Sequence, residues 1–527
     1  MKPRNLSLPQ ALFSAEQVRE IDRYAIEEKG INGFELMRKA ARFCFHTLIR
    51  KAPNTTHIIV LCGSGNNAGD GYIIAGLAKK RLLDVEVYYL AEPNLLKGDA
   101  KCAYEYCLSA DVNCQLYSPG VITNKKMTNR NKAKKNEKYD STLIVDALLG
   151  TGLNSEIKGR YLDAIIEANA SSYPTLSVDI PSGLSANTGQ IYGTSIKATW
   201  TSTFIGLKIG LFTGEGRNYS GDIFYNNLDV PDELISLQKP IATRLNIHQL
   251  LSSIRPRPIS THKGQCGHTL IIGGDHGFGG AVLMAAESAA RMGSGLTSVA
   301  TQMEYCSALL TRCPEVMVKG IQNAGDLKPL LSSADVIVIG PGLGQSEWSE
   351  QVLLAALKCS KPMVIDADAL NLLSKKKAEL KMPNQKASDL HILTPHPGEA
   401  ARLLGISTSD IQKDRLKAIK ALQQKWGGHV LLKGSGSLIC HPKADIKLCS
   451  YGNPGMASAG MGDVLSGMIG GILAQGFTPA FSLELAVCLH AKAADLAAEQ
   501  SGQRGLLATD LLPFARILIN KLCTSED

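Results

Sequence analysis

The residues best suited to chemistry form a glycine-rich run, NPGMASAGMGD, over residues 453–463, which leads into an apolar stretch over 464–474. Glycines let a backbone approach a ligand closely, and the N-terminus of the helix that should follow favours anions. Asp463 adds a carboxylate that could take a proton from a hydroxyl group as it attacks a phosphate. The chain has no G-x-x-x-x-G-K-[ST] motif, so this is not a P-loop.

Two further segments could support this site. Lys433–Ser437, with the sequence KGSGS, follows an expected strand over 430–432 and could cradle the phosphates of a nucleotide. His396 lies within TPHPGE, residues 394–399, where prolines on either side would fix its position. A lone histidine is more often structural, and both interpretations stay open. The glycine turns at 340–344, 273–274 and 279–281 would also let the backbone approach a ligand.

The first half of the chain carries a separate group of polar residues. The segment 63–71, GSGNNAGDG, contains a weak G-x-G-x-x-A match to the dinucleotide-binding fingerprint and should open a helix whose N-terminus suits a phosphate. Asp146 precedes ALLGTG, and Asp179 precedes IPSG, each at the end of an apolar strand. Together with Asn67, Asp70 and Ser182, these carboxylates would make a set of oxygen ligands that suits a hard cation.

These residues would be positioned by short apolar strands that alternate with helices, a pattern typical of parallel sheets covered on both faces. In the first half, the pattern predicts helices over 15–29, 34–52 and 71–80 and strands over 57–62, 85–90, 142–147 and 175–180. In the second half, it predicts strands over 269–273, 298–301, 336–340, 363–366 and 391–394, with helices over 281–292 and 398–404. A junction is expected within 231–258, which ends in Arg255-Pro-Arg-Pro258. Ligands of such sheets bind at the carboxyl ends of the strands.

Composition narrows the class of protein. The 527 residues are 44% hydrophobic and 20% charged, as in an ordinary globular protein, with a net charge of +8. Residues 124–138 carry seven basic residues and one acidic residue, and therefore most of that excess. This tract has almost no apolar residues, which favours a solvated loop over an RNA or membrane contact.

The thirteen cysteines include no C-x-x-C pair, which argues against zinc and thioredoxin-type sites. Neither a leader segment nor an apolar run of about 18 residues is visible, so a cytoplasmic protein with reduced thiols is expected.

The motifs GSGNNAGDG, DALLGTG and DIPSG, in this order, resemble the NAD(P)H-hydrate epimerase domain. That family interconverts the R and S epimers of hydrated NADH or NADPH and has a potassium site. The resemblance implies that Asn67, Asp146 and Ser182 hold K⁺ and that Asp179 is the acid or base at the hydroxyl-bearing carbon. It implies that the hydrated nucleotide is contacted by Asn66, Asn67, Ala68, Gly69, Asp70, Gly150, Thr151, Gly152, Leu153, Asn154, Ser155, Glu156 and Asp179.

NPGMASAGMGDVLSGMIGGILAQG, TPHPGE and GPGLG resemble the ADP-dependent NAD(P)H-hydrate dehydratase domain, which has a ribokinase-like fold. In that family the nucleotide phosphorylates the hydroxyl of the S hydrate, and phosphate then leaves to regenerate NAD(P)H. The resemblance implies that Asp463 is the base and that Ala281, Gly344, His396 and Asp463 contact the hydrated cofactor. It further implies that ADP, with Mg²⁺, binds at Lys433, Gly434, Ser435, Gly436, Ser437 and Gly462 and leaves as AMP.

Taken together, the sequence predicts two three-layer αβα domains, a Rossmann-like epimerase domain over 1–238 and a ribokinase-like dehydratase domain over 246–527. We expect a homo-oligomer that acts on hydrated NADH or NADPH and ADP, without a nucleic-acid or membrane partner. The main alternative is a ribokinase-like small-alcohol kinase fused to a non-catalytic nucleotide-binding domain. The choices between ADP and ATP, and between NADH and NADPH, stay open because each pair shares the groups that the motifs would bind.

Overall fold

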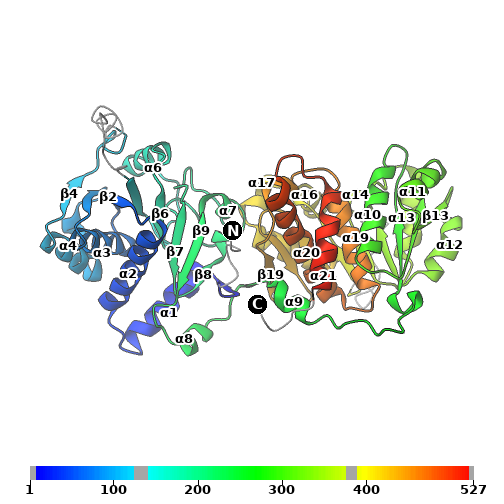
Figure 1. Cartoon of the computed structure of the whole chain (residues 1–527), viewed down its shortest axis with the longest axis horizontal. Coiled ribbons are helices and arrows are strands. Elements are labelled where there is room, and N and C mark those ends of the chain that lie inside the picture. The colour runs from blue at the N-terminus through cyan, green and yellow to red at the C-terminus, as the bar shows by residue number, and fades with distance from the viewer. Residues whose placement is uncertain (1–7, 124–140, 376–388, 522–527) are drawn as a thin grey trace. The chain divides into compact units, whose positions relative to one another are not determined.

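The computed structural model describes residues 8–123, 141–375 and 389–521 (Figure 1). The chain folds into two compact units, residues 1–242 and 243–527. The boundary between them lies inside the interval 239–245 that separates the two expected domains. The basic tract 124–138 lies outside the described residues.

The first unit is built on a seven-stranded sheet with the strand order β4-β3-β2-β5-β6-β7-β9, in which every neighbouring pair is parallel. The strands are β2 (Thr55–Cys62), β3 (Asp84–Tyr89), β4 (Asn113–Leu116), β5 (Ser141–Ala147), β6 (Thr175–Val178), β7 (Trp200–Phe204) and β9 (Asp222–Asn226). A short strand, β1 (Ala11–Phe13), pairs in parallel with β8 (Leu207–Lys208). The predicted parallel sheet is thus confirmed.

Helices cover both faces of this sheet. Successive side chains of a strand point to opposite faces, so the apolar strands present an apolar surface on each side. Ile58 and Val60 of β2 pack into the core formed with α1–α4, whereas Ile59 and Leu61 pack toward α6. The helices are α1 (Ala15–Glu27), α2 (Gly33–Lys51), α3 (Asn66–Lys80), α4 (Gly98–Ser109), α6 (Arg160–Ala170), α7 (Gly216–Tyr219) and α8 (Asp232–Ser236). The unit therefore has the three layers expected.

Two boundaries near the candidate site differ from the prediction. The helix expected over 71–80 begins earlier, at Asn66, because Gly65, in an extended conformation, is its N-cap residue. The strand expected over 175–180 ends at Val178, because Asp179 adopts a left-handed backbone conformation with φ of 65°. Both differences bring polar residues closer to the carboxyl ends of the strands.

The second unit contains a sheet in the order β13-β12-β11-β14-β15-β16-β17-β18-β19, parallel up to β17 and antiparallel from β17 to β19. Its strands are β11 (His268–Ile272), β12 (Leu296–Thr301), β13 (Met317–Gly320), β14 (Val336–Ile339), β15 (Met363–Ile365), β16 (His391–Leu393), β17 (His429–Leu432), β18 (Ser437–Cys440) and β19 (Ile446–Cys449). The sequence predicted the parallel strands β11, β12 and β14–β17, whereas the parallel edge strand β13 and the final antiparallel strands β18 and β19 were missed.

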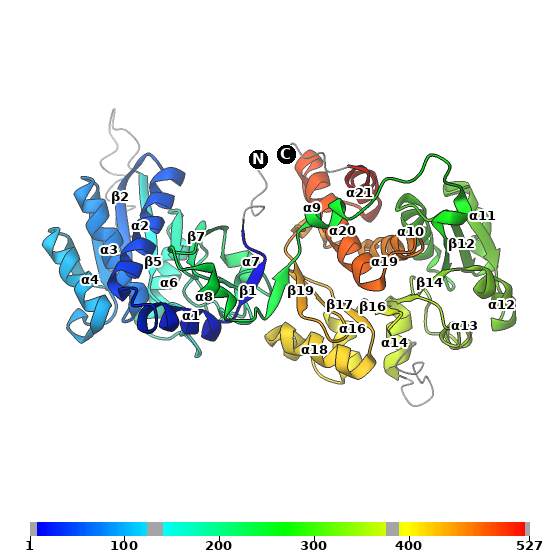
Figure 2. The same cartoon turned by 90° about the horizontal axis from the view of Figure 1, so that it is seen from below.

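Helices lie on both faces of this sheet as well (Figure 2). One face carries α10 (Gly279–Arg291), α19 (Met461–Leu473), α20 (Pro479–Ser501) and α21 (Leu511–Asn520). The other carries α12 (Ala324–Ser333), α13 (Glu347–Leu357), α14 (Ala367–Lys375), α16 (Pro397–Leu404) and α18 (Arg415–Trp426). The shorter helices are α9 (Ile247–Ser252), α11 (Cys306–Arg312) and α17 (Thr408–Lys413).

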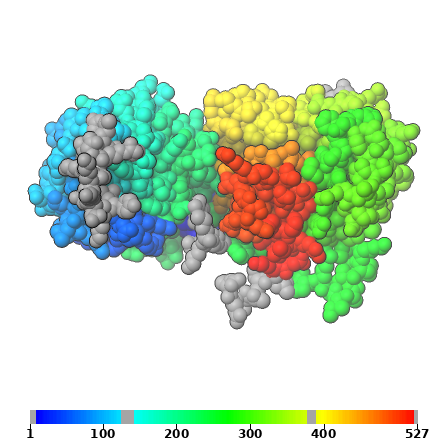
Figure 3. Space-filling view, turned by 45° about the horizontal axis from the view of Figure 1, so that its top comes forward, coloured from blue at the N-terminus to red at the C-terminus, as the bar shows by residue number. Residues whose placement is uncertain are grey.

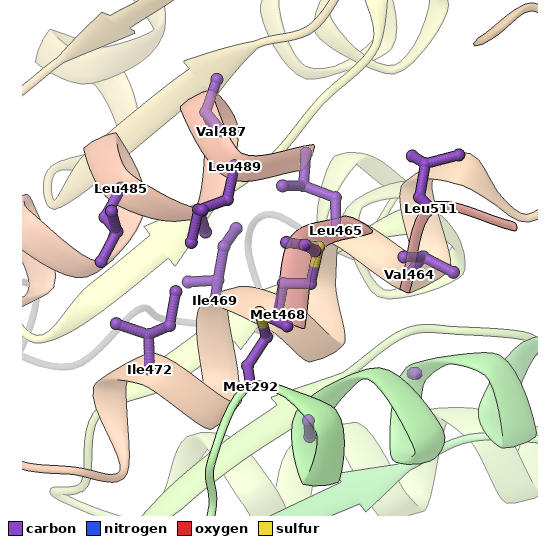
Figure 4. Close-up of a cluster of buried hydrophobic side chains, with 14 of the residues drawn as sticks. Met292, Val464, Leu465, Met468, Ile469, Ile472, Leu485, Val487, Leu489 and Leu511 are labelled. Carbon is purple, nitrogen blue, oxygen red and sulfur yellow. The ribbon is translucent and has the colours of Figure 1, made fainter. Parts of the chain in front are cut away.

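The core of the second unit is centred on α19. Its side chains Met468 and Ile472 belong to one buried cluster with Met292 and with leucines of α20, and Val464 lies beside Leu511 of α21 (Figure 4). On the face drawn in Figure 3, the last helices of this unit form a surface patch coloured orange to red. None of the helices in the described ranges is both long and apolar enough to cross a membrane.

Candidate active sites

A cavity of about 860 Å³ opens in the first unit where the strand order reverses. The chain leaves β2 toward β3 on one side and leaves β5 toward β6 on the other, which creates the crevice where α/β sheets bind ligands. The residues after both strands line the cavity, and α1 and α2 wall it. Ten of the predicted substrate residues line it, namely Asn66, Asn67, Asp70, Gly150, Thr151, Gly152, Leu153, Asn154, Ser155 and Asp179.

Three residues of the predicted set are not part of the cavity lining. Ala68 is fully buried in the core. Gly69 packs against Met37, where a Cβ atom would come within 2.6 Å of the sulfur. Glu156 points elsewhere, with Lys158 3.6 Å away. Their places in the motif are explained by packing and by a surface ion pair rather than by contact with the cavity.

An ion pair between Asp179 and Lys208 lies at the base of the cavity. The Lys208 side chain is only 1% exposed, and its amine also donates to the Phe204 carbonyl oxygen at 3.0 Å. Asp179 Oδ1 accepts from Lys208 and from Thr203 Oγ1 at 3.1 Å. Oδ1 is therefore committed to protein donors, which leaves the carboxylate held in one orientation with Oδ2 available to a ligand.

Two more carboxyl groups, those of Asp22 and Asp70, line the same cavity. Burial raises the pKa of Asp22, on α1, to about 6, against the opposing effect of Lys208. Burial also raises the pKa of Asp70 well above its ordinary value, and Asp179 and Asp22 add to that effect. Asp70 Oδ1 is buried with no hydrogen-bond partner among the described residues, as expected for a carboxyl group that keeps its proton. The cavity thus contains an ion-paired carboxylate, a carboxyl group that titrates at about pH 6 and a buried carboxyl group whose raised pKa favours the protonated form.

The residues predicted to hold a cation lie next to this cavity. The fully buried Asp146 accepts hydrogen bonds from Ser182 Oγ at 2.6 Å and from Ser177 Oγ at 2.7 Å, and no cationic side chain pairs with it in the described part of the chain. Ser182 Oγ also accepts a hydrogen bond from the Leu149 amide at 2.8 Å. The next residue, Gly150, faces the side chain of Asn67.

The third residue predicted to hold the cation is Asn67. Its Nδ2 is buried and has no hydrogen-bond partner within the residues the structure covers. Turning this amide would present its oxygen at the same buried position. A buried carboxylate, a hydroxyl and an amide without a cationic partner form an oxygen-rich donor set that fits a monovalent cation.

The second unit brings Asp463 together with an ion pair between the partly exposed Lys433 and the buried Asp366. Lys433 Nζ lies 2.8 Å from Asp366 Oδ1, and Ser466 Oγ donates to Asp366 Oδ2 at 2.7 Å. A Cβ atom on Gly462 would lie 3.2 Å from Lys433 Nζ, so the first turn of α19 rests directly on this pair. Gly460 begins that turn in the left-handed region, with φ of 85°, which favours glycine.

The pKa values of this cluster suit proton transfer. Burial raises the pKa of Asp463 to about 7, and the neighbouring Asp366 adds to the rise while Lys433 opposes it. Asp366 behaves differently although it is fully buried, because its contact with Lys433 outweighs burial and lowers its pKa. One carboxylate thus stays ionised as a counterion, and the other titrates near neutrality, as a general base requires.

His396 and Glu399 form the capping interaction of α16. His396 Nδ1 accepts from the Gly398 amide at 2.9 Å, and Glu399 accepts from the His396 amide at 2.8 Å. Burial raises the pKa of Glu399 to about 7 although Lys433, 3.9 Å away, opposes the rise. The structure therefore shows a helix-capping role for His396, whose exposed side chain is also near this charged cluster.

The predicted phosphate loop 433–437 is the tight turn between β17 and β18. Gly434 and Gly436 have positive φ values of 139° and 66°. The buried Arg415 stabilises the turn, because its guanidinium donates to the carbonyl oxygens of Leu432 and Lys433 at 3.2 and 3.3 Å. The turn exposes backbone groups beside Lys433, as a phosphate cradle needs.

Ala281 and Gly344 lie at the strand-order reversal of the second sheet, between β11 and β14. Ala281 is in the first turn of α10, and a Cβ atom on the neighbouring Gly342 would lie 3.1 Å from its side chain. The Gly344 amide already donates to Asp368 at 3.0 Å, so this residue would offer a ligand its close backbone approach rather than its N–H group.

Several residues of both sites were missed from the sequence. Asp22, Lys208, Asp366, Glu399 and Arg415 lie outside the glycine motifs. One signal was present for Lys208, which interrupts the apolar run Phe204-Ile-Gly-Leu-Lys208-Ile, because a lysine in such a run must find a buried partner. Asp366 ends the strand expected over 363–366 and Glu399 ends the TPHPGE motif, so both carried a signal that was not used, whereas Asp22 and Arg415 carry no such local signal.

Comparisons with known proteins also divide the chain into two regions. Residues 33–210 match a family model described as the YjeF-related protein N-terminus, and residues 269–515 match one described as NAD(P)H-hydrate dehydratase. The chain is 41% identical to the bifunctional NAD(P)H-hydrate repair enzyme Nnr of Coxiella burnetii, over 97% of this chain and 99% of that one.

The enzyme of the same name from Escherichia coli is 40% identical over 100% of this chain and 97% of its own. A crystal structure of the ADP/ATP-dependent NAD(P)H-hydrate dehydratase from Bacillus subtilis, co-crystallized with ATP/Mg²⁺, is 28% identical, covers 52% of this chain and 96% of that one, and has a TM-score of 0.46. The chain therefore belongs to the family of bifunctional NAD(P)H-hydrate repair enzymes, with an epimerase domain followed by a dehydratase domain.

Proposed function

We propose that the cavity of the first unit epimerises hydrated NAD(P)H and that the Asp463 cluster of the second unit dehydrates the S epimer with ADP as phosphate donor. The observation that carries this proposal is the placement of Asp463, with a pKa of about 7, beside the Lys433–Asp366 ion pair and the N-terminus of α19. It combines a base with an anion site, the two groups that phosphoryl transfer to a hydroxyl needs.

In the epimerase site, Asp179 Oδ2 would accept or return a proton at the hydroxyl-bearing carbon. Lys208 pairs with Asp179 and holds it in one orientation, while the buried Asp70, whose pKa is raised well above its ordinary value, can donate a proton. Epimerisation needs a base on one side of the reacting carbon and an acid to reprotonate it. The ion-paired Asp179 and the protonated Asp70 supply both.

Asn67, Asp146 and Ser182 would hold K⁺, and the resident ion would supply positive charge beside the cavity. The oxygen donors and the orphaned Asn67 amide support this assignment. Replacing K⁺ in the buffer by the larger N-methylglucamine cation should lower epimerase activity and leave the dehydratase reaction unchanged. Equal epimerase rates in both buffers would contradict the potassium site.

In the dehydratase site, Asp463 would take the proton of the S-hydrate hydroxyl as that oxygen attacks the β-phosphate of ADP. Lys433 and the amides that open α19 would hold the transferring phosphoryl group, and AMP leaves. The phosphate ester would then lose inorganic phosphate to restore NAD(P)H. Mg²⁺ would enter with ADP and neutralise its phosphates. Ala281, Gly344 and His396 are the proposed contacts of the hydrated cofactor, and residues 433–437 with Gly462 those of ADP.

The test uses a mixture of R- and S-hydrated NADH with either ADP or ATP and follows the return of near-ultraviolet absorbance. Full recovery requires both sites, whereas recovery of the S fraction alone would contradict the epimerase assignment. A small-alcohol kinase, the alternative, would leave a stable phosphorylated product and restore no absorbance. The same assay settles the choice of donor.

Partners and location extend this proposal. The glycine turns and helix N-termini that support nucleotide binding act without bulk positive charge, so we propose no nucleic-acid or membrane partner. We also propose a cytoplasmic location and a homo-oligomer. Replacing the lysines of the tract 124–138 by serine should leave both activities unchanged. A loss of RNA binding by that variant would contradict the absence of a nucleic-acid partner.

A further inference from the structure

A second cavity, of about 940 Å³, lies in the dehydratase unit and includes none of the residues of the proposed reaction sites. Its walls come from α9, from the segment that follows it, and from the C-terminal ends of α10, α19 and α21. Part of this wall, Arg255-Pro-Arg-Pro258, was predicted from the sequence only as the end of the junction between the two halves of the chain. The volume is in the range of cavities that bind small organic ligands.

The lining of this cavity is strongly basic. Five of its residues are cationic and none is acidic, the five being Arg255, Arg257, Arg291, Arg516 and Lys521. Arg257 is anchored, because it donates to the Gly293 carbonyl oxygen at 2.7 Å, and Arg291 lies 3.5 Å from Glu287. For Arg255, Arg516 and Lys521, no ion pair exists within the described part of the chain. Three cations are therefore gathered around one space without a counterion.

Helix C-termini explain only part of this charge. Each carries the equivalent of about −0.5 elementary charge, so α10, α19 and α21 together offer about −1.5 against five positive charges. The surplus positive charge raises the energy of the free protein, and an anionic ligand would relieve it.

One wall of the cavity is apolar. Leu251, Ile254 and Ile519 line it together with Phe477, whose ring packs 5.1 Å from the ring of Phe481. The basic segment beside this wall contains Pro256 and Pro258, which restrict the backbone around Arg255 and Arg257. Cations beside an aromatic and aliphatic wall suit a ligand with an anionic end and a flat, apolar body.

We propose that this cavity binds a small phosphate monoester that carries an aromatic or apolar group, at a site separate from both reaction sites. Two helices link it to the dehydratase centre. α10 begins at the turn with Ala281 and ends at the cavity with Arg291, and α19 begins beside Asp463 and reaches the cavity just before Gln475. Each helix has 13 residues, which places the two sites about 20 Å apart.

The experiment measures binding of 1-naphthyl phosphate to the full chain by calorimetry, with AMP at saturating concentration so that the nucleotide site is filled. We expect one site per chain whose affinity falls at high salt. Arg255→Gln/Arg516→Gln should weaken binding at least tenfold and keep both enzymatic activities. The matched control, Lys328→Gln/Lys358→Gln, removes two exposed lysines of the same unit and should bind normally.

Four outcomes would overturn the proposal. They are no binding in the presence of AMP, equal binding by the arginine variant, equal loss by the lysine variant, and equal affinity for neutral 1-naphthalenemethanol. A chain that ends at Lys521 provides a fifth check, because residues 522–527 include Glu526 and Asp527. Binding that occurs only in this shortened chain would assign the cavity to the protein's own carboxylates.

Discussion

Each candidate site contains one ion pair between a lysine and a carboxylate, and one partner of each pair is almost fully buried. Lys208 holds Asp179 in the epimerase cavity, and Lys433 holds Asp366 beneath α19. Breaking such a pair from one side leaves an uncompensated buried charge, which costs about 3–5 kcal/mol. These pairs therefore matter for stability as well as for chemistry.

Lys208→Met tests the first pair. Without the lysine, Asp179 faces Asp22 and Asp70 with no counterion, so we expect epimerase activity to disappear and the free energy of unfolding of this unit to fall by about 3–5 kcal/mol. Dehydratase activity on the purified S hydrate should stay intact. The double variant Lys208→Met/Asp179→Asn removes both charges and should regain stability without activity, as chemical denaturation and the epimerase assay would show.

Asp463→Asn tests the proposed base with almost no change in volume. Loss of general-base catalysis should lower dehydratase kcat/KM by about 10²- to 10⁴-fold, because the hydroxyl must then attack without transferring its proton. The epimerase rate of the same sample is the internal control and should not change. Near wild-type turnover by this variant would rule out Asp463 as the base.

The raised pKa of Asp463 predicts the pH dependence of the dehydratase. A base acts only when deprotonated, so kcat/KM should rise about tenfold per pH unit below pH 7 and level off above it. Glu399 also has a pKa of about 7 and could imitate this profile. Glu399→Gln separates the two, since the rise should persist in this variant if Asp463 causes it.

Among the elements, α19 and α10 are decisive because their backbones touch. A Cβ atom on Gly467 would collide with the Ala285 carbonyl oxygen and with Ser288 Oγ. Ser288 Oγ in turn donates to the Val464 carbonyl oxygen at 2.9 Å, which joins the two helices near Asp463. The glycines of this segment thus serve helix packing as well as ligand approach.

Gly467→Ala should push α19 away from α10 and lower the free energy of unfolding of the dehydratase unit by about 1–3 kcal/mol. Because α19 carries Asp463, dehydratase activity should fall with it. Gly280→Ala is the matched control, since a Cβ atom there meets nothing within 4 Å and alanine favours a helix. Thermal unfolding of both variants distinguishes a packing effect from a general effect of added methyl groups.

At the scale of the whole molecule, each compact unit has its own hydrophobic core and its own candidate site. Residues 1–242 and 243–527, produced separately, should therefore each fold. A mixture of the two should restore NADH from both hydrate epimers in the presence of ADP, whereas the second part alone should restore only the S fraction. Failure of either part to fold, judged by circular dichroism and a cooperative melt, would contradict this independence.

The sequence by itself determined the local parts of this protein. Asp463, the glycines before it and the segment 63–71 lie within short motifs, and the alternation of apolar strands with helices predicted both parallel sheets. These features depend on neighbours in the chain, so they are visible without a structure.

The tertiary structure alone decided which distant residues complete each site. Asp22 and Lys208 reach Asp179 from α1 and β8, and Asp366 meets Lys433 from a different strand end. Sequence separation says nothing about such contacts, and a pKa depends on burial and on charges that only folding brings together. For this reason the motifs predicted the positions of the candidate sites, while the lysine–carboxylate pairs within them became visible only in the folded chain.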